Sequence, residues 1–368
     1  MHLYIHVPFC ARRCSYCDFA IAVRREVPSA RFAELIEREW AGWQTHAAWE
    51  DSPGLDTIYF GGGTPSRLDP GAITRLLHGF RTDRSVTPGA EITLEANPDD
   101  VTPANAEAWL AAGVNRISLG AQSFDPAVLE WMHRTHDAAQ IGLAMRTLRS
   151  AGFSDISLDL IYAVPPALDR DWAADMEQAL ALEPTHLSLY GLTIEPATPL
   201  GKWTARGESI SLDDDHAAAE YLAAHDRLVA SGFEHYEVSN AGRPGHRARH
   251  NSAYWRRAPF IGLGPSAHSG FASTRRWNVR DWTEYSRRAE AGKSLMLEEE
   301  ALDREQVDLE ALYLGLRTSD GLAAARVPGE IANRWSSSSW AVVDDSRVVL
   351  TPEGWLRLDA LVASLSRC

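Results

Sequence analysis

Short apolar runs alternate with longer amphipathic segments over the first half of the chain. The intervening segments place apolar residues at helical spacing, as Phe32, Leu35 and Ile36 do after Ser29. Others lie at 105–112, 128–151 and 172–182. Strands alternating with helices favour an α/β fold with a parallel sheet, whose sites lie at the carboxyl ends of the strands. The predicted strands cover 3–7, 55–60, 91–96, 115–120, 155–162 and 185–192.

Three of the four cysteines follow directly after the first predicted strand. Cys10, Cys14 and Cys17 have the spacing C-x3-C-x2-C, whereas Cys368 is the last residue. A closed zinc site takes four ligands, and no second Cys or His pair is visible, although His6 could complete such a site. An iron–sulfur cluster held by only three thiolates leaves one iron open to an outside ligand. The residues alone leave zinc, an iron–sulfur cluster and a coincidental grouping open.

Charge and hydropathy indicate the compartment in which these thiols are found. The net charge of −14 argues against a nucleic-acid backbone as the main partner. No run approaches the roughly 18 apolar residues of a membrane span, and no signal peptide precedes the first predicted strand. We therefore expect a cytoplasmic protein with at most peripheral membrane contact. In that compartment clustered cysteines stay reduced and more often bind metal than form disulfides.

Glycines and polar residues follow the next four predicted strands. The segment GGGTPS (61–66) contains three consecutive glycines, which predict either a positive φ or close approach of the backbone to a ligand. A tight strand-to-helix turn is the alternative. Glu95, Gln122 and Asp159 lie at or near the ends of three successive strands. Each could be a helix cap, but together they mark one rim of the sheet.

The spacing of Cys10, Cys14 and Cys17 resembles the radical S-adenosylmethionine (SAM) superfamily. The resemblance implies a partial, three-quarter TIM-type (β/α)6 barrel. It also implies a [4Fe–4S] cluster held by these three cysteines, with SAM bound to the open iron through its amino and carboxylate groups. The glycine segment resembles the part of the family that binds the SAM amino group, with Gly62, Gly63 and Thr64 as the matching residues.

Further SAM contacts follow from the resemblance and from side-chain chemistry. Carboxylates and an amide suit the ribose hydroxyls and the amino group, and the Arg134 guanidinium suits the methionine carboxylate. Tyr4 and Tyr16 flank the cysteine loop and could meet the sulfonium and the adenine by cation–π and stacking contacts. The predicted SAM residues outside the glycine segment are Tyr4, Tyr16, Glu95, Gln122, Arg134 and Asp159.

Longer segments narrow the resemblance to the HemN/HemW branch of the superfamily. LYIHVPFC, IYFGGGTPS, EANP, NRISLGAQSF and SLDLIYAVP lie within a match that spans most of residues 3–270. HemN proteins, the oxygen-independent coproporphyrinogen III dehydrogenases, carry a further cysteine where this chain has Phe19. They also have a long N-terminal extension, whereas only Met1 and His2 precede the first strand here. Both departures put propionate decarboxylation in doubt and favour the haem chaperones of the HemW type.

A third segment favours the same side of the branch. RHNSAYW (249–255) matches an H-N-x-x-Y-W segment typical of HemW. Haem takes axial ligands such as His or Tyr and is walled by aromatic rings. The haem candidates are His250, Tyr254, Trp255 and His268. The alternative is that His250 and Asn251 cap a turn while the aromatic rings pack.

The resemblance implies a haem chaperone that binds haem, the cluster and SAM and delivers haem to apo-haemoproteins, with a homodimer as one option. The alternative is an enzyme that decarboxylates coproporphyrinogen III. We predict a barrel over 1–195, an extension over 196–297 and a smaller C-terminal α+β domain over 298–368. In the last domain, a hairpin with DDSR at its turn precedes a helix capped by Thr351, as in a winged helix. No densely basic recognition helix accompanies it, so a lid or interaction role is favoured over DNA binding.

Overall fold

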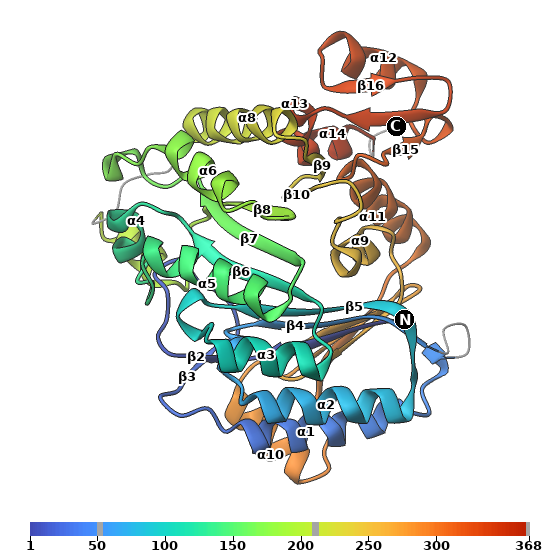
Figure 1. Ribbon diagram of the computed structural model, residues 1–368. Coiled ribbons are helices and arrows are strands. Elements are labelled where there is room, and N and C mark those ends of the chain that lie inside the picture. The colour runs from blue at the N-terminus through green and yellow to red at the C-terminus, as the bar shows by residue number, and fades with distance from the viewer. Residues whose placement is uncertain (50–53, 208–212, 366–368) are drawn as a thin grey trace.

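The structure, a computed structural model, describes residues 1–49, 54–207 and 213–365. Within these residues a 12-stranded sheet carries the parallel strands that the sequence predicted (Figure 1). Each strand pairs in parallel with the next, so all carboxyl ends lie at one rim. The α/β class and the six predicted strands are confirmed. They are β1 (His2–Val7), β4 (Gly54–Gly62), β5 (Ser85–Ala96), β6 (Arg116–Gln122), β7 (Asp155–Tyr162) and β8 (His186–Gly191).

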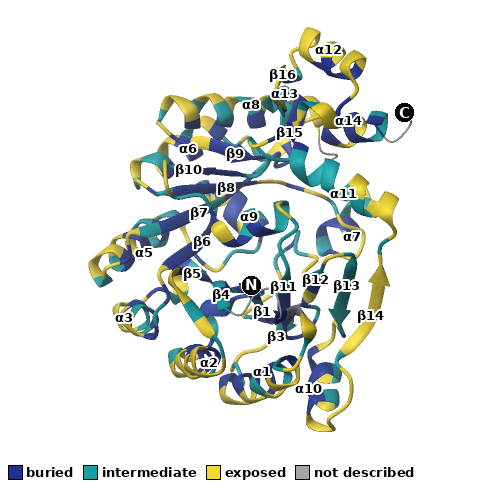
Figure 2. Ribbon diagram, turned by 90° about the vertical axis from the view of Figure 1, so that its right-hand side faces the viewer, coloured by how far each residue is buried: buried dark blue, intermediate teal, exposed yellow. Residues whose placement is uncertain are grey.

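Shorter strands extend the sheet at both edges. Beyond β1 the sheet continues with a parallel neighbour and three antiparallel strands: β11 (Phe260–Leu263), β12 (His268–Phe271), β13 (Thr274–Asn278) and β14 (Met296–Ala301). Beyond β8 it continues with β10 (Asn240–Gly242) and β9 (Glu234–Glu237). Over the described residues β14 and β9 do not pair with each other, so the arc of strands in Figure 2 stays open, as a partial barrel does.

Helices cover the outer face of the arc (Figure 1). Those between the parallel strands are α1 (Ser29–Trp43), α2 (Pro70–Asp83), α3 (Pro103–Ala112), α4 (Pro126–Trp131), α5 (Ala138–Ala151) and α6 (Trp172–Ala181). The later helices are α7 (Pro199–Ala205), α8 (Asp214–Ala230), α9 (Arg249–Trp255), α10 (Trp282–Glu290), α11 (Arg304–Leu316), α12 (Gly329–Ser337), α13 (Pro352–Trp355) and α14 (Leu358–Leu365). A small parallel pair, β2 (Phe9–Cys10) and β3 (Ala22–Val23), flanks the cysteine loop.

The amphipathic segment predicted over 128–151 is wrong as one continuous helix. α4 ends at Trp131, and His133 adopts φ +59°, a left-handed conformation that interrupts a helix. α5 then starts afresh, because Asp137 and Gln140 form a reciprocal capping box at its first turn. The break places Arg134 on a loop beside the sheet rim instead of on a helix face.

The strands alternate apolar and polar side chains, and this alternation separates the core from the barrel interior. In β1, Leu3 and Ile5 are fully buried in the hydrophobic core, whereas Tyr4 and His6 point to the opposite face. Tyr4 stacks on Tyr59 of the neighbouring strand β4, with 6.1 Å between the two ring centres. The apolar face packs against the helices, so the inside of the arc is left polar and available for a site.

The C-terminal segment forms a small α+β unit with its own core. β15 (Leu322–Ala323), β17 (Arg347–Leu350) and β16 (Ala341–Val343) form a three-stranded antiparallel sheet. The Thr351 side chain caps α13 as the sequence predicted. Tyr221 from α8 joins this core, and β14 pairs with β13 across the predicted boundary at 297/298. The division of the chain into three domains stays a prediction. β14 crosses one of the predicted boundaries.

In the part of the chain that the structure describes, no helix combines the length and the apolar content that crossing a bilayer requires.

Trp335 lies at the centre of the small core, where its side chain is 1% exposed. We expect Trp335→Ala to lower the free energy of unfolding of this unit by about 3–5 kcal/mol, because it removes a large buried side chain and leaves a cavity. Val342→Ala is the control, since Val342 is 65% exposed and its change should stay within about 0.5 kcal/mol. Urea denaturation measures both, and equal effects of the two substitutions would contradict the assigned core.

Candidate functional site

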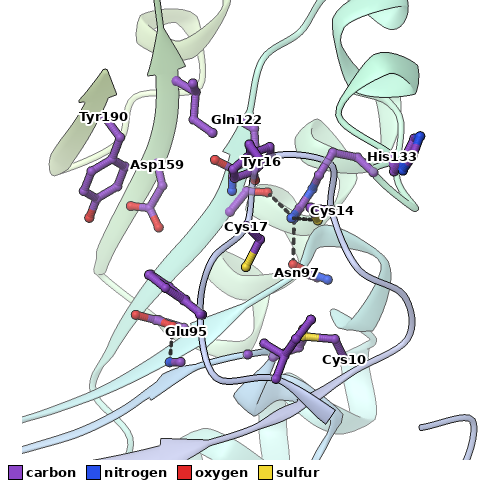
Figure 3. Close-up of a pocket in the computed structure, with 18 of the residues that line it drawn as sticks. Cys10, Cys14, Tyr16, Cys17, Glu95, Asn97, Gln122, His133, Asp159 and Tyr190 are labelled. Atoms are coloured by element: carbon purple, nitrogen blue, oxygen red, sulfur yellow. Dashed lines mark hydrogen bonds between the residues drawn. The ribbon is translucent and has the colours of Figure 1, made fainter. Parts of the chain in front are cut away.

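A cavity of about 380 Å³ opens at the carboxyl rim of the parallel strands. It is lined by the cysteine loop, the glycine segment, and residues at or near the ends of β5, β6, β7 and β8, as Figure 3 shows. Its size lies within the range of small-molecule sites. The structure brings together here most of the residues predicted for a cluster and SAM: Cys10, Cys14, Tyr16, Cys17, Gly62, Gly63, Thr64, Glu95, Gln122, Arg134 and Asp159.

The three thiols lie along one wall of the cavity and are free. The Thr64 hydroxyl donates to Cys10 Sγ at 3.5 Å, and Arg134 Nη1 lies 3.5 Å from Cys14 Sγ. Desolvation raises the pKa of Cys17 to about 11 and also raises that of Cys10. Partly buried thiols of this kind become thiolates when a metal binds them, because the metal supplies the missing positive charge.

Two glycines bring the backbone of the loop after β4 against the cysteine loop. Gly62 has φ +112°, and a Cβ on it would lie 2.6 Å from the His6 ring. A Cβ on Gly63 would lie 2.9 Å from the Val7 carbonyl oxygen and 3.0 Å from Cys10 Sγ. Any larger residue would therefore push the two loops apart. The positive φ that the consecutive glycines predicted is confirmed at Gly62, whereas close approach to a ligand stays a prediction.

Glu95 holds the glycine loop from the strand beside it. Its Oε2 accepts a hydrogen bond from the Gly62 N–H at 2.9 Å, and its Oε1 accepts one from the Tyr59 hydroxyl at 2.8 Å. Desolvation raises the pKa of Glu95 to about 7. Asp159 accepts from the Ser118 hydroxyl at 2.9 Å, and desolvation raises its pKa as well.

Neither carboxyl group forms an ion pair within the residues that the structure describes. A ligand that carries a positive charge or several hydroxyl groups would stabilise the ionised form of both carboxyl groups.

Gln122 reaches the rim through an irregular end of β6. The register between β6 and β7 shifts between Leu119 and Gln122, and Gln122 has φ +70°. A left-handed conformation at a residue other than glycine costs on the order of 1–3 kcal/mol and is concentrated at functional sites. Nearby, Arg134 donates to the Asn97 side-chain oxygen at 2.7 Å and to the Gly120 carbonyl oxygen at 3.1 Å (Figure 3).

The cavity lining also contains residues that the sequence did not predict, among them Asn97, His133 and Tyr190. Tyr190 follows the same rule as Glu95, because it lies at the carboxyl end of a parallel strand, and that rule could have found it. Asn97 follows Glu95 directly and orients Arg134. His133 had no sequence signal, since it lies inside the segment predicted as one helix.

Tyr4 does not line the cavity, unlike the other predicted SAM residues. Its hydroxyl shares a hydrogen bond of 3.1 Å with His6 Nδ1, and its ring stacks on Tyr59, which in turn holds Glu95. Tyr4 therefore lies behind the site. Tyr16 does line the cavity, where desolvation raises its pKa above the ordinary value.

The haem candidates lie elsewhere. His250 is 1% exposed at the other end of the barrel, where its Nδ1 bonds the Thr57 hydroxyl at 2.6 Å and its Nε2 bonds the Tyr254 hydroxyl at 2.7 Å. Thr57 lies near the start of β4, whereas Gly62 ends it. His268 is exposed on β12 and stacks on Trp277. The structure thus joins His250 to Tyr254, with both ring nitrogens in use, but it does not gather the four candidates around one space.

Comparison with known proteins shows which family this chain belongs to. The Radical SAM superfamily profile matches residues 4–179. A Mycobacterium tuberculosis protein named heme chaperone HemW is 35% identical over 370 residues, which cover 99% of this chain and 94% of the relative. The chain belongs to the HemW family. A Synechocystis protein that is also named heme chaperone HemW is 35% identical, and the match covers 88% of this chain and 80% of the relative.

The chain also shares its fold with a solved structure from the HemN side of the branch. Coproporphyrinogen III oxidase (HemN) from Escherichia coli superimposes with a TM-score of 0.81, covering 99% of this chain and 89% of that one, at 20% identity. At that identity the likeness shows the fold alone. The three-quarter barrel predicted from the resemblance agrees with it.

The radical SAM family implies a [4Fe–4S] cluster and SAM as cofactors of this chain, and the residues at the rim fit them. The three free thiols share one wall, and Gly63 leaves room beside Cys10 that a Cβ would fill. Among the described residues no three His, Cys, Asp or Glu side chains converge as they would on a single metal ion. A cubane cluster takes its thiolates on different irons, so its ligands need not converge on one point.

Replacing Cys10, Cys14 or Cys17 by Ala should abolish the [4Fe–4S] chromophore, because two thiolates do not hold the cube. Iron, acid-labile sulfide and the visible spectrum measure this. Cys368→Ala is the matched control and should keep the cluster; Cys368 itself lies outside the described residues. Full iron and sulfide in the Cys14→Ala protein would contradict the assignment.

Gln122→Ala and Asp159→Ala should each weaken SAM binding by about 1–3 kcal/mol, or about 5- to 150-fold, because a buried polar partner is left unpaired. Titration calorimetry on the cluster-containing protein measures the affinity, and iron content should not change. Glu107→Gln is the control, since Glu107 is an exposed residue of α3. SAM affinity equal to wild type in both rim variants would mean that these residues only cap the strands.

Proposed function

We propose that this protein is a haem chaperone of the HemW type, which binds haem and delivers it to apo-haemoproteins. The supporting observation is the identity of 35% with a relative named heme chaperone HemW over nearly the whole of both chains. The match covers 99% of this chain, so it extends over the C-terminal unit as well as the barrel. The acceptor proteins, a homodimer and a cytoplasmic location stay predictions.

The rim cavity would hold the cluster and SAM. Cys10, Cys14 and Cys17 would ligate the cluster, whose open iron supplies a coordination position for the amino and carboxylate groups of SAM. The glycine loop lies beside Cys10 at Gly63, and Glu95 holds that loop in place through the Gly62 N–H. Glu95 and Asp159 would accept hydrogen bonds from ligand hydroxyl or ammonium groups, which compensates the desolvation that raises their pKa values.

Arg134 and Tyr16 would position the rest of SAM. The Arg134 guanidinium is held by Asn97 and Gly120, so its remaining N–H groups have a fixed direction for a carboxylate. Tyr16 lines the cavity and offers a ring face for stacking. These roles bind and orient SAM without requiring that it be cleaved.

The alternative function is decarboxylation of coproporphyrinogen III, and the structural likeness to HemN is the observation that favours it. Phe19 argues against it. This residue lines the mouth of the cavity and is 55% exposed, at the position where the HemN pattern has a further cysteine. A phenyl ring cannot exchange protons or hydrogen atoms as a thiol does, so the site lacks that reactive group.

The deciding experiment compares two substrates on the same reconstituted protein. We expect a stable haem complex of one haem per chain by Soret absorbance and transfer of that haem to apomyoglobin as a surrogate acceptor. We expect no protoporphyrinogen from coproporphyrinogen III, SAM and a reductant. Escherichia coli HemN is the positive control for the second reaction. Efficient turnover of coproporphyrinogen III without stable haem binding would overturn the chaperone assignment.

A further inference from the structure

A second cavity, of about 400 Å³, lies at the other end of the barrel from the thiols. Its walls come from α9, β9, the end of α11 and the loops of the C-terminal unit, elements that Figure 1 shows side by side. Four arginines line it, namely Arg247, Arg249, Arg256 and Arg347, against one carboxylate, Asp320. In a chain with a net charge of −14 this is a local concentration of positive charge.

The arginines differ in how far other groups neutralise them. Arg247 forms ion pairs with Glu234 at 3.2 Å and with Asp320 at 3.4 Å. Arg249 donates only to the Gly89 carbonyl oxygen, at 2.6 Å, and Arg347 donates to the Gly321 carbonyl oxygen at 3.1 Å. Arg256 forms no side-chain hydrogen bond or ion pair with any residue that the structure describes. Several guanidinium N–H groups therefore remain available to an anion.

Trp255 gives the cavity an aromatic wall with an unused donor. Its indole Nε1 is buried and has no hydrogen-bond partner among the described residues. An indole N–H can only donate, so an acceptor oxygen of a ligand would satisfy it. The Arg317 guanidinium lies 4.4 Å from the ring centre of Trp255, and Tyr236 also lines the cavity. The combination of flat aromatic side chains and guanidinium groups matches a planar ligand that carries carboxylates.

We propose that this arginine-lined cavity binds the propionate edge of haem. The proposal rests on the proposed function, which supplies haem as the ligand, and it names the part of the molecule that holds it. Each propionate would take a bidentate pair of N–H groups from a guanidinium, with Arg249 and Arg256 as the principal partners and the Trp255 indole N–H as a further donor. Haem would then bind at the barrel end opposite the cluster, without sharing a ligand with it.

The test compares haem with its dimethyl ester, in which both propionates are neutral. Wild-type protein with its cluster is titrated with ferric haem and with the ester, and the Soret band gives the affinities. We expect the ester to bind about 10-fold more weakly or worse, because charge-assisted hydrogen bonds are lost.

Arg256→Glu should weaken haem binding by about the same factor and leave the affinity for the ester unchanged. This variant changes an exposed side chain without a described partner, so its fold is retained; iron content and SAM affinity equal to wild type verify this. Trp255→Phe keeps an aromatic wall but removes the donor, and should weaken haem binding severalfold. Arg287→Glu, an exposed arginine of α10, is the matched control and should leave haem affinity unchanged.

Two results overturn the inference alone: wild-type affinity for haem in both Arg256→Glu and the Arg249→Ala/Arg256→Ala double variant, or equal affinities of the wild type for haem and its ester. Absence of haem binding by the wild-type protein would instead overturn the proposed function together with this inference. The two failures are therefore distinguishable in the same titration.

Discussion

The parallel pairing of β1, β4 and β5 brings the cysteine loop, the glycine loop and Glu95 to one place on the rim. In this register Val7 lies opposite Gly62 and Phe60 lies opposite Leu94, so the cysteine loop, the glycine loop and Glu95 emerge together. Because side chains alternate along a strand, a slip of one residue in β5 would turn Glu95 into the hydrophobic core and Leu94 into the cavity. The fully buried Leu94 and the core around it exclude that slip, and so the packing of the helices protects the chemistry of the rim.

Polar groups inside the barrel are stabilised in a connected series. Glu95 holds Gly62 and Tyr59, and the Tyr59 ring stacks on His250 at 5.0 Å. His250 in turn bonds Thr57 on the same strand as Tyr59. Buried polar groups that are all partnered rigidify a structure, whereas unpartnered ones destabilise it. Through these contacts the H-N-x-x-Y-W segment therefore stabilises the end of the barrel that carries Glu95 and the glycine loop, although it lies far from the thiols.

The barrel thus offers two chemically different ends on the same strands. At the carboxyl end β4 and β5 present Gly62 and Glu95 to a cavity lined by thiols and carboxyl groups. At the amino end β5 presents Glu91, whose carboxylate accepts from the N–H groups of Arg249 and His250 and so caps α9. α9 then carries arginines and Trp255 into the second cavity. The two cavities are therefore separate, and a ligand in one would not compete with a ligand in the other for the same residues.

The sequence by itself determined the strands, the cysteine spacing, the glycine loop and the rim carboxylates, because each depends on a local period or on a rule for strand ends. The family followed from the same short segments. Tertiary structure alone decided the break at His133, the place of Tyr4 behind the site and the burial of His250 with both nitrogens bonded. Those outcomes depend on contacts such as Thr57 with His250, which are distant in sequence and leave no periodic pattern. The second cavity is of the same kind, since its arginines come from α9 and its flanking residues and from β17, and only packing brings them together.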